Sequence, residues 1–254
     1  MARTVAHVKE MAAIPAVVGR ILYLCNIGCG QGCCGHRASC GNLHSYVHDQ
    51  IEYGVIKKEY TMLDNLKKYK VILASASPRR RELLAGLEVE FEVRALPDVD
   101  ESFPPELQGG DIPLHISKKK ADAYRPVMAA DELVITADTI VWLDGVALGK
   151  PVDEADARRM LRNMSGKTHS VFTGVAITTK DNQRCFVAQS DVTFAQLTDD
   201  EIDYYIAKYR PMDKAGSYGA QEWIGYIGMS NIVGSYFNVM GLPVQRLYSE
   251  LKEI

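Results

Sequence analysis

Residues 71 to 82 read VILASASPRRRE, an apolar run followed by a serine/proline turn and three arginines at the start of a helical pattern. β-Branched and apolar residues such as those at 71–73 are typical of a buried strand. Ser77 is a residue type that caps helices, and Pro78 follows it at the first helical position, where its missing N–H costs nothing. This stretch therefore predicts a strand, a turn and a helix.

The same turn has features that attract anions. Free backbone N–H groups and the positive end of the helix dipole face it. Arg79, Arg80 and Arg81 add permanent charges on planar groups that suit phosphate oxygens. From spacing alone, a solvated helix start with surface arginines is an equally good interpretation.

Composition agrees with a soluble enzyme. A chain of 254 residues with 47% hydrophobic content can bury one large core or two modest ones. The net charge of −3 and the pI of about 6.1 provide no bulk attraction to nucleic acid or to an anionic membrane. No apolar run approaches the roughly 18 to 20 residues of a membrane span. We therefore expect a cytoplasmic protein without nucleic-acid or membrane partners, whose phosphate affinity is local.

The N-terminal part differs in composition from the rest. Five of the six cysteines lie between Cys25 and Cys40, with histidines nearby. Thiolates and imidazoles at short spacing can hold zinc or iron, but these spacings match no paired CxxC pattern. A secretory or lipoprotein signal fits poorly, because Arg20 interrupts the apolar stretch and Leu24 stands where a small residue should precede the cysteine.

Beyond Met62, strand-like and helix-like segments alternate, which predicts an α/β architecture. The expected strands are 71–73, 91–96, 133–138, 169–179 and 185–197, and the expected helices are one opened by Pro78, then 111–125, 153–164, 198–208 and one opened by Pro243. Asp144-Gly145 is a hairpin signal, and Thr198 with Glu201 is a capping-box pattern. The order implies one sheet-centred domain with helices on its faces.

The segment SASPRRRELL (75–84) resembles the first motif of the Maf family, nucleotide pyrophosphatases related in fold to the inosine triphosphatases of the Ham1 type. Four more blocks follow in family order: ADTIVWLDGVALGKP (137–151), LRNMSGKTHSVFTGVAI (161–177), PMDKAGSYGAQ (211–221) and NVMGLPV (238–244). The resemblance implies a long, bent mixed β-sheet flanked by helices, with two lobes and the active site in a central cleft.

The resemblance also suggests a boundary. MLDNLKKYKVILAS, from Met62, is how a Maf-like chain ordinarily starts. We predict a nucleotide pyrophosphatase domain over residues 62–254. Residues 1–61 are then a Cys-rich extension, either disordered or translated from a misassigned start.

Asp138 and Glu101 are the expected catalytic carboxylates. Asp138 ends the apolar run LVITA, so its carboxylate should emerge at the edge of the sheet, where ligands of α/β proteins bind. Hydrolysis of a phosphoanhydride needs an attacking water and usually a divalent cation, and oxygen ligands suit Mg²⁺ or Mn²⁺. The family resemblance implies that Asp138 is the proton acceptor and that Glu101 helps hold the metal. Without it, an aspartate that caps a turn is the simpler interpretation.

Cations must balance a triphosphate. The resemblance implies that Lys120, in KKKADA, and Lys150, in LGKP, face the site with Arg79, Arg80 and Ser77. Lys118 and Lys119 point elsewhere on the predicted helix. Thus the phosphate-binding set comes from three separate segments of the chain.

The branch of the family that acts on dTTP and UTP carries an arginine after SxSP, a threonine after the catalytic aspartate and a glutamine after the small-residue block. This chain has Arg79, Thr139 and Gln221 at those places. A glutamine amide offers a donor and an acceptor to a pyrimidine edge. In a departure from the family pattern, Glu222 follows Gln221 and brings a negative charge near a polyanionic substrate.

The resulting prediction is a metal-assisted nucleoside triphosphate pyrophosphatase that converts dTTP or UTP to the monophosphate and pyrophosphate. By resemblance, its purpose is to clear non-standard nucleotides. Two alternatives stay open: a pyrophosphatase for 7-methyl-GTP or modified pyrimidine nucleotides, and a non-catalytic nucleotide-binding regulator of septum formation. A homodimer is compatible with this sequence, which does not decide the oligomeric state.

Overall fold

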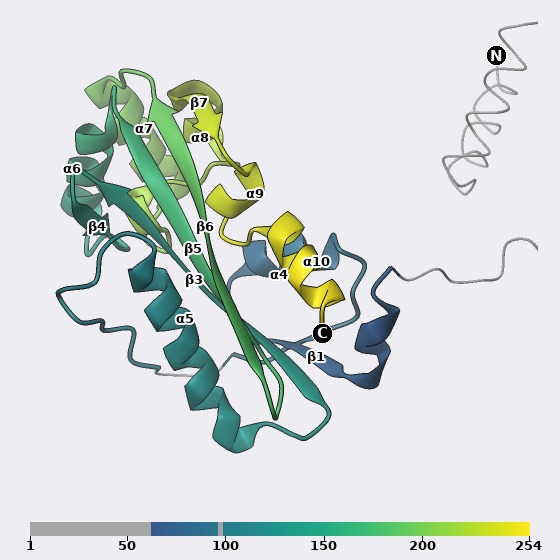
Figure 1. Cartoon of the computed structure of the whole chain (residues 1–254). Helices are drawn as coiled ribbons and strands as arrows, with labels where there is room; N and C mark the ends of the chain where they lie inside the picture. The colour runs from purple at the N-terminus through teal and green to yellow at the C-terminus, as the bar shows by residue number, and fades with distance from the viewer. Residues whose placement is uncertain (1–61, 96–98) are drawn as a thin grey trace, which may run out of the picture. The chain divides into compact units, whose positions relative to one another are not determined.

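The computed structural model describes residues 62–95 and 99–254, all of which belong to the unit Thr61–Ile254 (Figure 1). The predictions for residues 1–61, including the cysteine cluster, lie outside the described residues. In the described part, no helix is long and apolar enough to cross a membrane.

The described elements alternate between strands and helices, as expected. The strands are β1 (Lys70–Leu73), β2 (Glu92–Val93), β3 (Glu132–Leu143), β4 (Val146–Leu148), β5 (Thr168–Thr178), β6 (Gln183–Phe194) and β7 (Met229–Val233). The α-helices are α4 (Pro78–Ala85), α5 (Asp111–Tyr124), α6 (Glu154–Met164), α7 (Asp199–Tyr209), α8 (Trp223–Gly228), α9 (Tyr236–Val239) and α10 (Val244–Lys252). Short 3-10 helices are η2 (Asp64–Lys68), η3 (Arg125–Val127) and η4 (Ala215–Ser217).

The seven strands form one mixed sheet in the order β2-β1-β3-β5-β6-β7, with β4 paired to β3. β1 runs parallel to both of its neighbours, and the remaining pairs are antiparallel. The predicted mixed sheet flanked by helices is therefore confirmed.

One edge of β3 is open at its middle. β1 pairs with β3 as far as Leu73 opposite Ile135, and β4 pairs with it only from Val141 onward. Between these positions, no described strand pairs with residues 136–140 on that side, whereas β5 covers the other side throughout. This edge is therefore filled by side chains of other elements rather than by a strand, and residues 137–141 border a cavity there.

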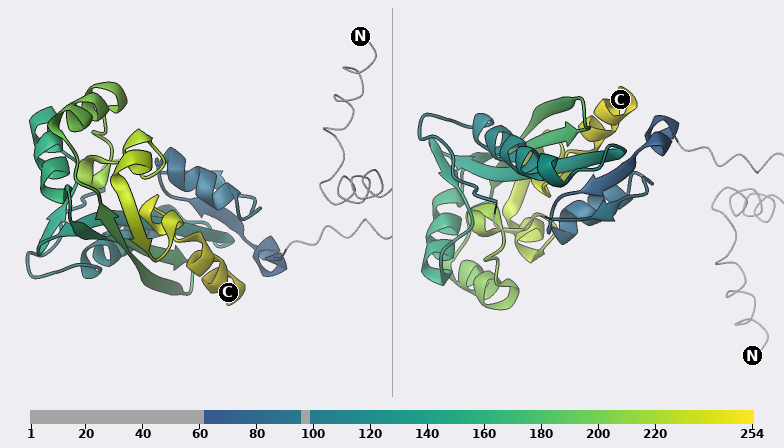
Figure 2. Two further views of the ribbon diagram at one scale, coloured as in Figure 1. Left: turned by 90° about the horizontal axis from the view of Figure 1, so that it is seen from above. Right: turned by 90° about the horizontal axis from the view of Figure 1, so that it is seen from below.

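Helices cover both faces of the sheet (Figures 1 and 2). Side chains alternate along a strand, so neighbouring residues of β3 face opposite helices. Val134 and Ile140 pack in clusters with residues of α5, while Leu133 and Ile135 pack with leucines of α4 and α10. Asp138 therefore faces α5, and its neighbour Thr139 faces α4.

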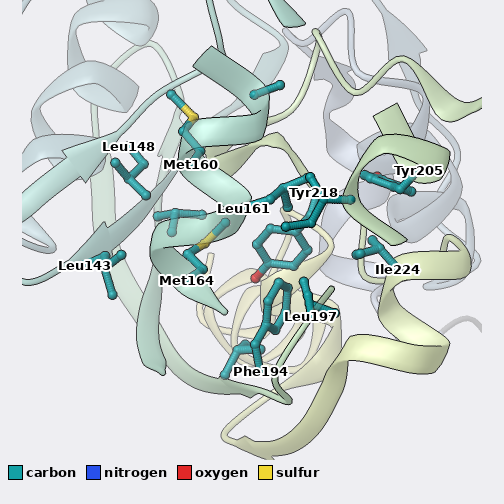
Figure 3. Close-up of a cluster of buried hydrophobic side chains, with 14 of the residues drawn as sticks. Leu143, Leu148, Met160, Leu161, Met164, Phe194, Leu197, Tyr205, Tyr218 and Ile224 are labelled. Atoms are coloured by element: carbon teal, nitrogen blue, oxygen red, sulfur yellow. The ribbon is translucent and has the colours of Figure 1, made fainter. Parts of the chain in front are cut away.

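The apolar residues form two main cores. One joins α4 and α10 to β1 and the first half of β3, around Leu84, Leu247 and Leu251. The other joins α6, α7 and α8 to the second half of β3 and to β6, around Leu161 and Phe194 (Figure 3). The long strands β3 and β5 run through both cores, which agrees with the expected two lobes.

Several local predictions are confirmed. Ser77 caps α4, with Pro78 in its first turn and the serine side chain accepting a hydrogen bond from the backbone N–H of Arg80. Thr198 and Glu201 form the expected capping box of α7. Asp144 and Gly145, both with positive φ, connect β3 and β4 as a hairpin.

Two expectations were wrong in detail. β3 continues to Leu143 rather than ending at Asp138, because the apolar residues TIVWL carry the strand past the aspartate into the second core. The strand expected over 91–96 is only Glu92–Val93 in the described part. Helices α8 and α9 and strand β7 were not predicted at all.

Candidate active site

A cavity of about 740 Å³ lies at the open middle of β3. Its wall includes all nine residues for which a catalytic or substrate-binding role was expected: Ser77, Arg79, Arg80, Glu101, Lys120, Asp138, Thr139, Lys150 and Gln221. They come from α4, α5, β3 and four loops. The fold thus gathers residues that are up to 144 positions apart in sequence (from Ser77 to Gln221) around one space.

Lys120 joins the two expected catalytic carboxylates. Its Nζ lies 2.8 Å from Oδ1 of Asp138 and 2.8 Å from Oε1 of Glu101. Asp138 is nearly buried, whereas the Glu101 side chain is half exposed. Partial burial works to raise the pKa of Glu101, but the hydrogen bond from Lys120 and the charges of Lys120, Lys150 and Arg80 outweigh it and lower the pKa. Glu101 is therefore a carboxylate at neutral pH.

The Arg80 guanidinium is tied mainly to the protein. Nε donates to the Gly241 carbonyl at 2.8 Å, and Nη1 donates to the Ala137 carbonyl at 2.9 Å and to Ser75 Oγ at 3.3 Å. Nη2 donates to Thr139 Oγ1 at 3.0 Å. Four of the five N–H groups of an arginine are thus occupied, and one is left for a substrate.

Arg79 and Lys150 are more open. Arg79 pairs through Nη1 with Oδ2 of Asp213 at 3.0 Å and lies at the cavity wall. Lys150 is exposed and makes no hydrogen bond or ion pair to any residue in ranges 62–95 and 99–254. An unpaired ammonium at the rim can reach a phosphate without breaking an existing contact.

Most residues of the segment 213–221 line the cavity, all except Gly216 and Ser217, and part of their environment was not foreseen. Lys214, only 7% exposed, contacts Asp213 Oδ1 at 2.7 Å and Glu222 Oε1 at 3.1 Å. The charge of Glu222, which looked unfavourable in sequence, is therefore balanced. Sequence reasoning missed Asp213 and Lys214 because a loop rich in small residues carries no periodic signal.

The side chain of Gln221 has an unused acceptor. Its Oε1 atom is buried and has no hydrogen-bond partner among the residues that the structure describes. A buried acceptor without a partner is costly, so it points to a group that a ligand would supply.

His169 is not a general base in this arrangement. Burial lowers its pKa to about 4, with the Asp191 charge opposing this shift, so the imidazole is neutral at pH 7. Its Nε2 lies 2.8 Å from the hydroxyl of Tyr218, inside the second core. It packs as a structural histidine against Phe194 and Tyr218.

The carboxylates suit a divalent cation that shares its coordination with a substrate. No cluster of three or more metal-ligating side chains occurs within the described ranges. Mg²⁺ commonly uses one or two carboxylates together with phosphate oxygens and waters, and Asp138 and Glu101 could provide that number. The number and type of these two carboxylates therefore suit such an ion.

The fold and the cavity define an α/β protein whose sheet edge opens onto a polar pocket built from carboxylates, arginines and lysines. The chain belongs to the Maf family, since the profile of the family described as "Maf-like protein" matches residues 70–254.

Curated relatives resemble this chain over most of its length. A "dTTP/UTP pyrophosphatase" of Phocaeicola vulgatus is 64% identical over 193 residues, which is 76% of this chain and 100% of the relative. A protein of the same name from Bacteroides fragilis is 61% identical over 193 residues, again 76% of this chain and 100% of the relative. One from Porphyromonas gingivalis is 56% identical over 194 residues, 76% of this chain and 98% of the relative.

Among solved structures, a HAM1 protein from Coxiella burnetii aligns with 73% of this chain and 100% of its own, at 15% identity and a TM-score of 0.41.

Proposed function

We propose that this protein is a nucleoside triphosphate pyrophosphatase that hydrolyses dTTP and UTP to the monophosphate and pyrophosphate. The observation that carries the proposal is the nearly buried carboxylate of Asp138, which faces a cavity whose wall also bears Arg79, Lys120 and Lys150. The names of the relatives described above support the choice of reaction and of nucleotide.

The chemistry follows from the positions of these groups. Asp138 accepts a proton from a water that attacks the α-phosphorus, and the bond from that phosphorus to the bridging oxygen breaks to release pyrophosphate. Lys120 keeps its ammonium between Asp138 and Glu101, which orients both carboxylates. Arg79 and Lys150 bind phosphate oxygens, and the N-terminus of α4 behind Ser77 presents backbone N–H groups to them.

Asp138 and Glu101 would also hold a Mg²⁺ or Mn²⁺ ion with the phosphates. The bound ion would neutralise charge that develops on the phosphate oxygens. Arg80 acts mainly as a positioning residue, because its hydrogen bonds fix the open edge of β3 and the hydroxyl of Thr139.

The nucleotide selectivity belongs to Arg79, Thr139 and Gln221. The unpartnered Oε1 of Gln221 favours a base that offers an N–H donor, as uracil and thymine do at their ring N3. Residues 62–254 carry this activity as one domain in the cytoplasm. These residues supply every group named in the mechanism.

The test is pyrophosphate release from dTTP, UTP, CTP, GTP and 7-methyl-GTP with Mg²⁺ or Mn²⁺. We expect the wild type to prefer dTTP and UTP, and Asp138→Asn to lose about 10² to 10⁴ of kcat, the usual contribution of a general base. The matched control is Asp144→Asn in the exposed hairpin, which should behave as the wild type. Release from none of these nucleotides would reject the activity, and a fully active Asp138→Asn would reject the assigned base.

A further inference from the structure

A polar network lies behind the cavity wall, and the roles assigned above account for only some of its residues. Tyr205 of α7 is completely buried, and it sits with Ile224 among the apolar side chains of the second core (Figure 3). Its hydroxyl donates a short hydrogen bond to Oε2 of Glu222. The same hydroxyl accepts a hydrogen bond from the backbone N–H of Gly219 at 3.0 Å. Tyr205 thus connects α7 to Gly219 and Glu222, on either side of Gln221.

The network continues from Glu222 to the phosphate side of the cavity. The second carboxylate oxygen of Glu222 accepts from Nζ of Lys214 at 3.1 Å. Lys214 also contacts Asp213 at 2.7 Å, and Asp213 in turn pairs with Arg79 at 3.0 Å. An unbroken series of polar contacts therefore links Arg79 to the hydroxyl of Tyr205.

Steric packing holds the same loop. A Cβ atom at Gly219 would lie 2.9 Å from Cδ of Glu222 and 3.1 Å from Cε of Lys214. Real Cβ atoms do not approach other heavy atoms that closely without displacing them. The loop backbone is thus pressed against the Glu222 and Lys214 side chains on one side and lines the cavity with Gly219, Ala220 and Gln221.

We propose that Tyr205, Glu222 and Lys214 form a positioning network that fixes the backbone on either side of Gln221, through Gly219 and Glu222, and thereby places the Gln221 side chain for recognition of the nucleobase. The inference rests on the function proposed above and extends its account of nucleotide choice. Uracil and thymine carry an N–H at N3 that can donate to the unpartnered Oε1 of Gln221, whereas N3 of cytosine is an acceptor and would face it unfavourably. A polar site discriminates in this way only if its groups are held in place, and the network holds the backbone from which the Gln221 side chain extends.

The protonation of Tyr205 supports this arrangement. Burial, followed by the hydrogen bond to Glu222, raises the pKa of Tyr205 well above its usual value. The phenol of Tyr205 therefore keeps its proton and donates it to the hydrogen bond with Glu222.

The experiment compares Tyr205→Phe and Glu222→Gln with the wild type in the full chain. Tyr205→Phe removes both hydrogen bonds at constant shape. We expect kcat/KM for dTTP and UTP to fall about tenfold, mainly through KM, with that for CTP nearly unchanged. The ratio of kcat/KM for dTTP to kcat/KM for CTP should therefore fall by about the same factor. Glu222→Gln keeps an acceptor for Tyr205 but loses the charge opposite Lys214, and should change the ratio in the same direction.

The matched control is Tyr209→Phe, on the same helix. The Tyr209 ring stacks on Tyr205 at 5.2 Å, but its hydroxyl has no hydrogen-bond partner within the described residues. This variant should keep the wild-type nucleotide ratio.

The outcomes separate the two proposals. Equal losses for dTTP, UTP and CTP would mean that the network only stabilises the fold, and would overturn the inference while leaving the pyrophosphatase activity intact. A wild type that hydrolyses neither dTTP nor UTP would overturn the proposed function and this inference together. Thermal unfolding identifies a variant that fails to fold, and if Tyr205→Phe does so, the ratio measured for Glu222→Gln decides.

Discussion

Arg80 illustrates how one side chain can complete a sheet. β1 ends at Leu73, so the carbonyl of Ala137 in β3 has no strand partner on that side. The guanidinium supplies the missing donor and bonds at the same time to Gly241, beyond α9. Burial lowers the pKa of Arg80, and the Asp138 charge partly offsets the shift, but an arginine remains protonated at any physiological pH. The cavity floor is thus held by a permanent cation.

His169 should make the stability of the protein depend on pH. Its pKa is about 4 in the folded protein and 6.5 in a model peptide, so the unfolded chain binds more protons between these values. The contribution of the neutral imidazole is present above pH 6.5 and is lost as the pH falls toward 4. We expect about 2 kcal/mol less free energy of unfolding from this residue at pH 5 than at pH 7.

Denaturant titrations of the wild type and of His169→Phe at these two pH values check this expectation. The variant should be less stable at pH 7, because Tyr218 loses its hydrogen-bond partner. It should nevertheless show a smaller loss on going to pH 5. An identical pH dependence in both proteins would show that His169 does not titrate in this range.

At the scale of elements, the position of Lys120 depends on how closely α5 approaches the sheet. Gly174 of β5 lies opposite Asp138 of β3, and a Cβ there would lie 2.4 Å from backbone atoms of Pro113 and Leu114. Helix α5 therefore rests directly on the backbone of β5. Because Lys120 projects from the same helix, this contact sets its distance to Asp138.

We expect Gly174→Ala to displace α5 and to separate Lys120 from Asp138. The variant should lose about 1 to 3 kcal/mol of stability through overpacking, together with much of its kcat. Unfolding curves and pyrophosphate release measure the two effects. Gly86→Ala is the matched control, because its Cβ would meet the nearest atom, the Leu83 carbonyl oxygen, at 3.3 Å, a contact that a small shift relieves. Full activity of Gly174→Ala would contradict the role assigned to this contact.

Elements with strong local signals were predictable. Ser77 and Pro78 marked the start of α4, and Thr198 with Glu201 marked that of α7, because capping depends on residues only three positions apart. The length of β3 was underestimated since a polar residue within an apolar run looks like an end. The polar residue is Asp138, whose carboxylate pairs with Lys120 of α5. No local sequence pattern reveals this partner.

At the scale of the whole molecule, the cavity lies where the two cores meet along β3 and β5. One core is built around α4 and α10, and the other around α6, α7 and α8. Both parts contribute positively charged side chains to the cavity wall: Arg79 lies on α4, and Lys150 follows β4. A ligand held by both should stabilise the fold against unfolding.

The whole-molecule arrangement predicts that a chain beginning at Met62 is sufficient for activity. All nine residues with expected roles, and both cores, lie within 62–254. We expect this shorter chain and the full chain to give the same kcat/KM for dTTP and the same rise in Tm with added nucleotide. Activity confined to the full chain would instead give residues 1–61 a function.

The sequence by itself determined the α/β class and the starts of α4 and α7, and its resemblance to the Maf family predicts the set of site residues. These depend on periodicity, on caps and on motifs that are short in sequence. Only the tertiary structure decided that Arg80 mainly completes the sheet edge, that Lys120 bridges Asp138 and Glu101, and that Glu222 is balanced by Lys214 and Tyr205. Each of these is a contact between segments distant in sequence, and its partner is set by how the helices pack on the sheet.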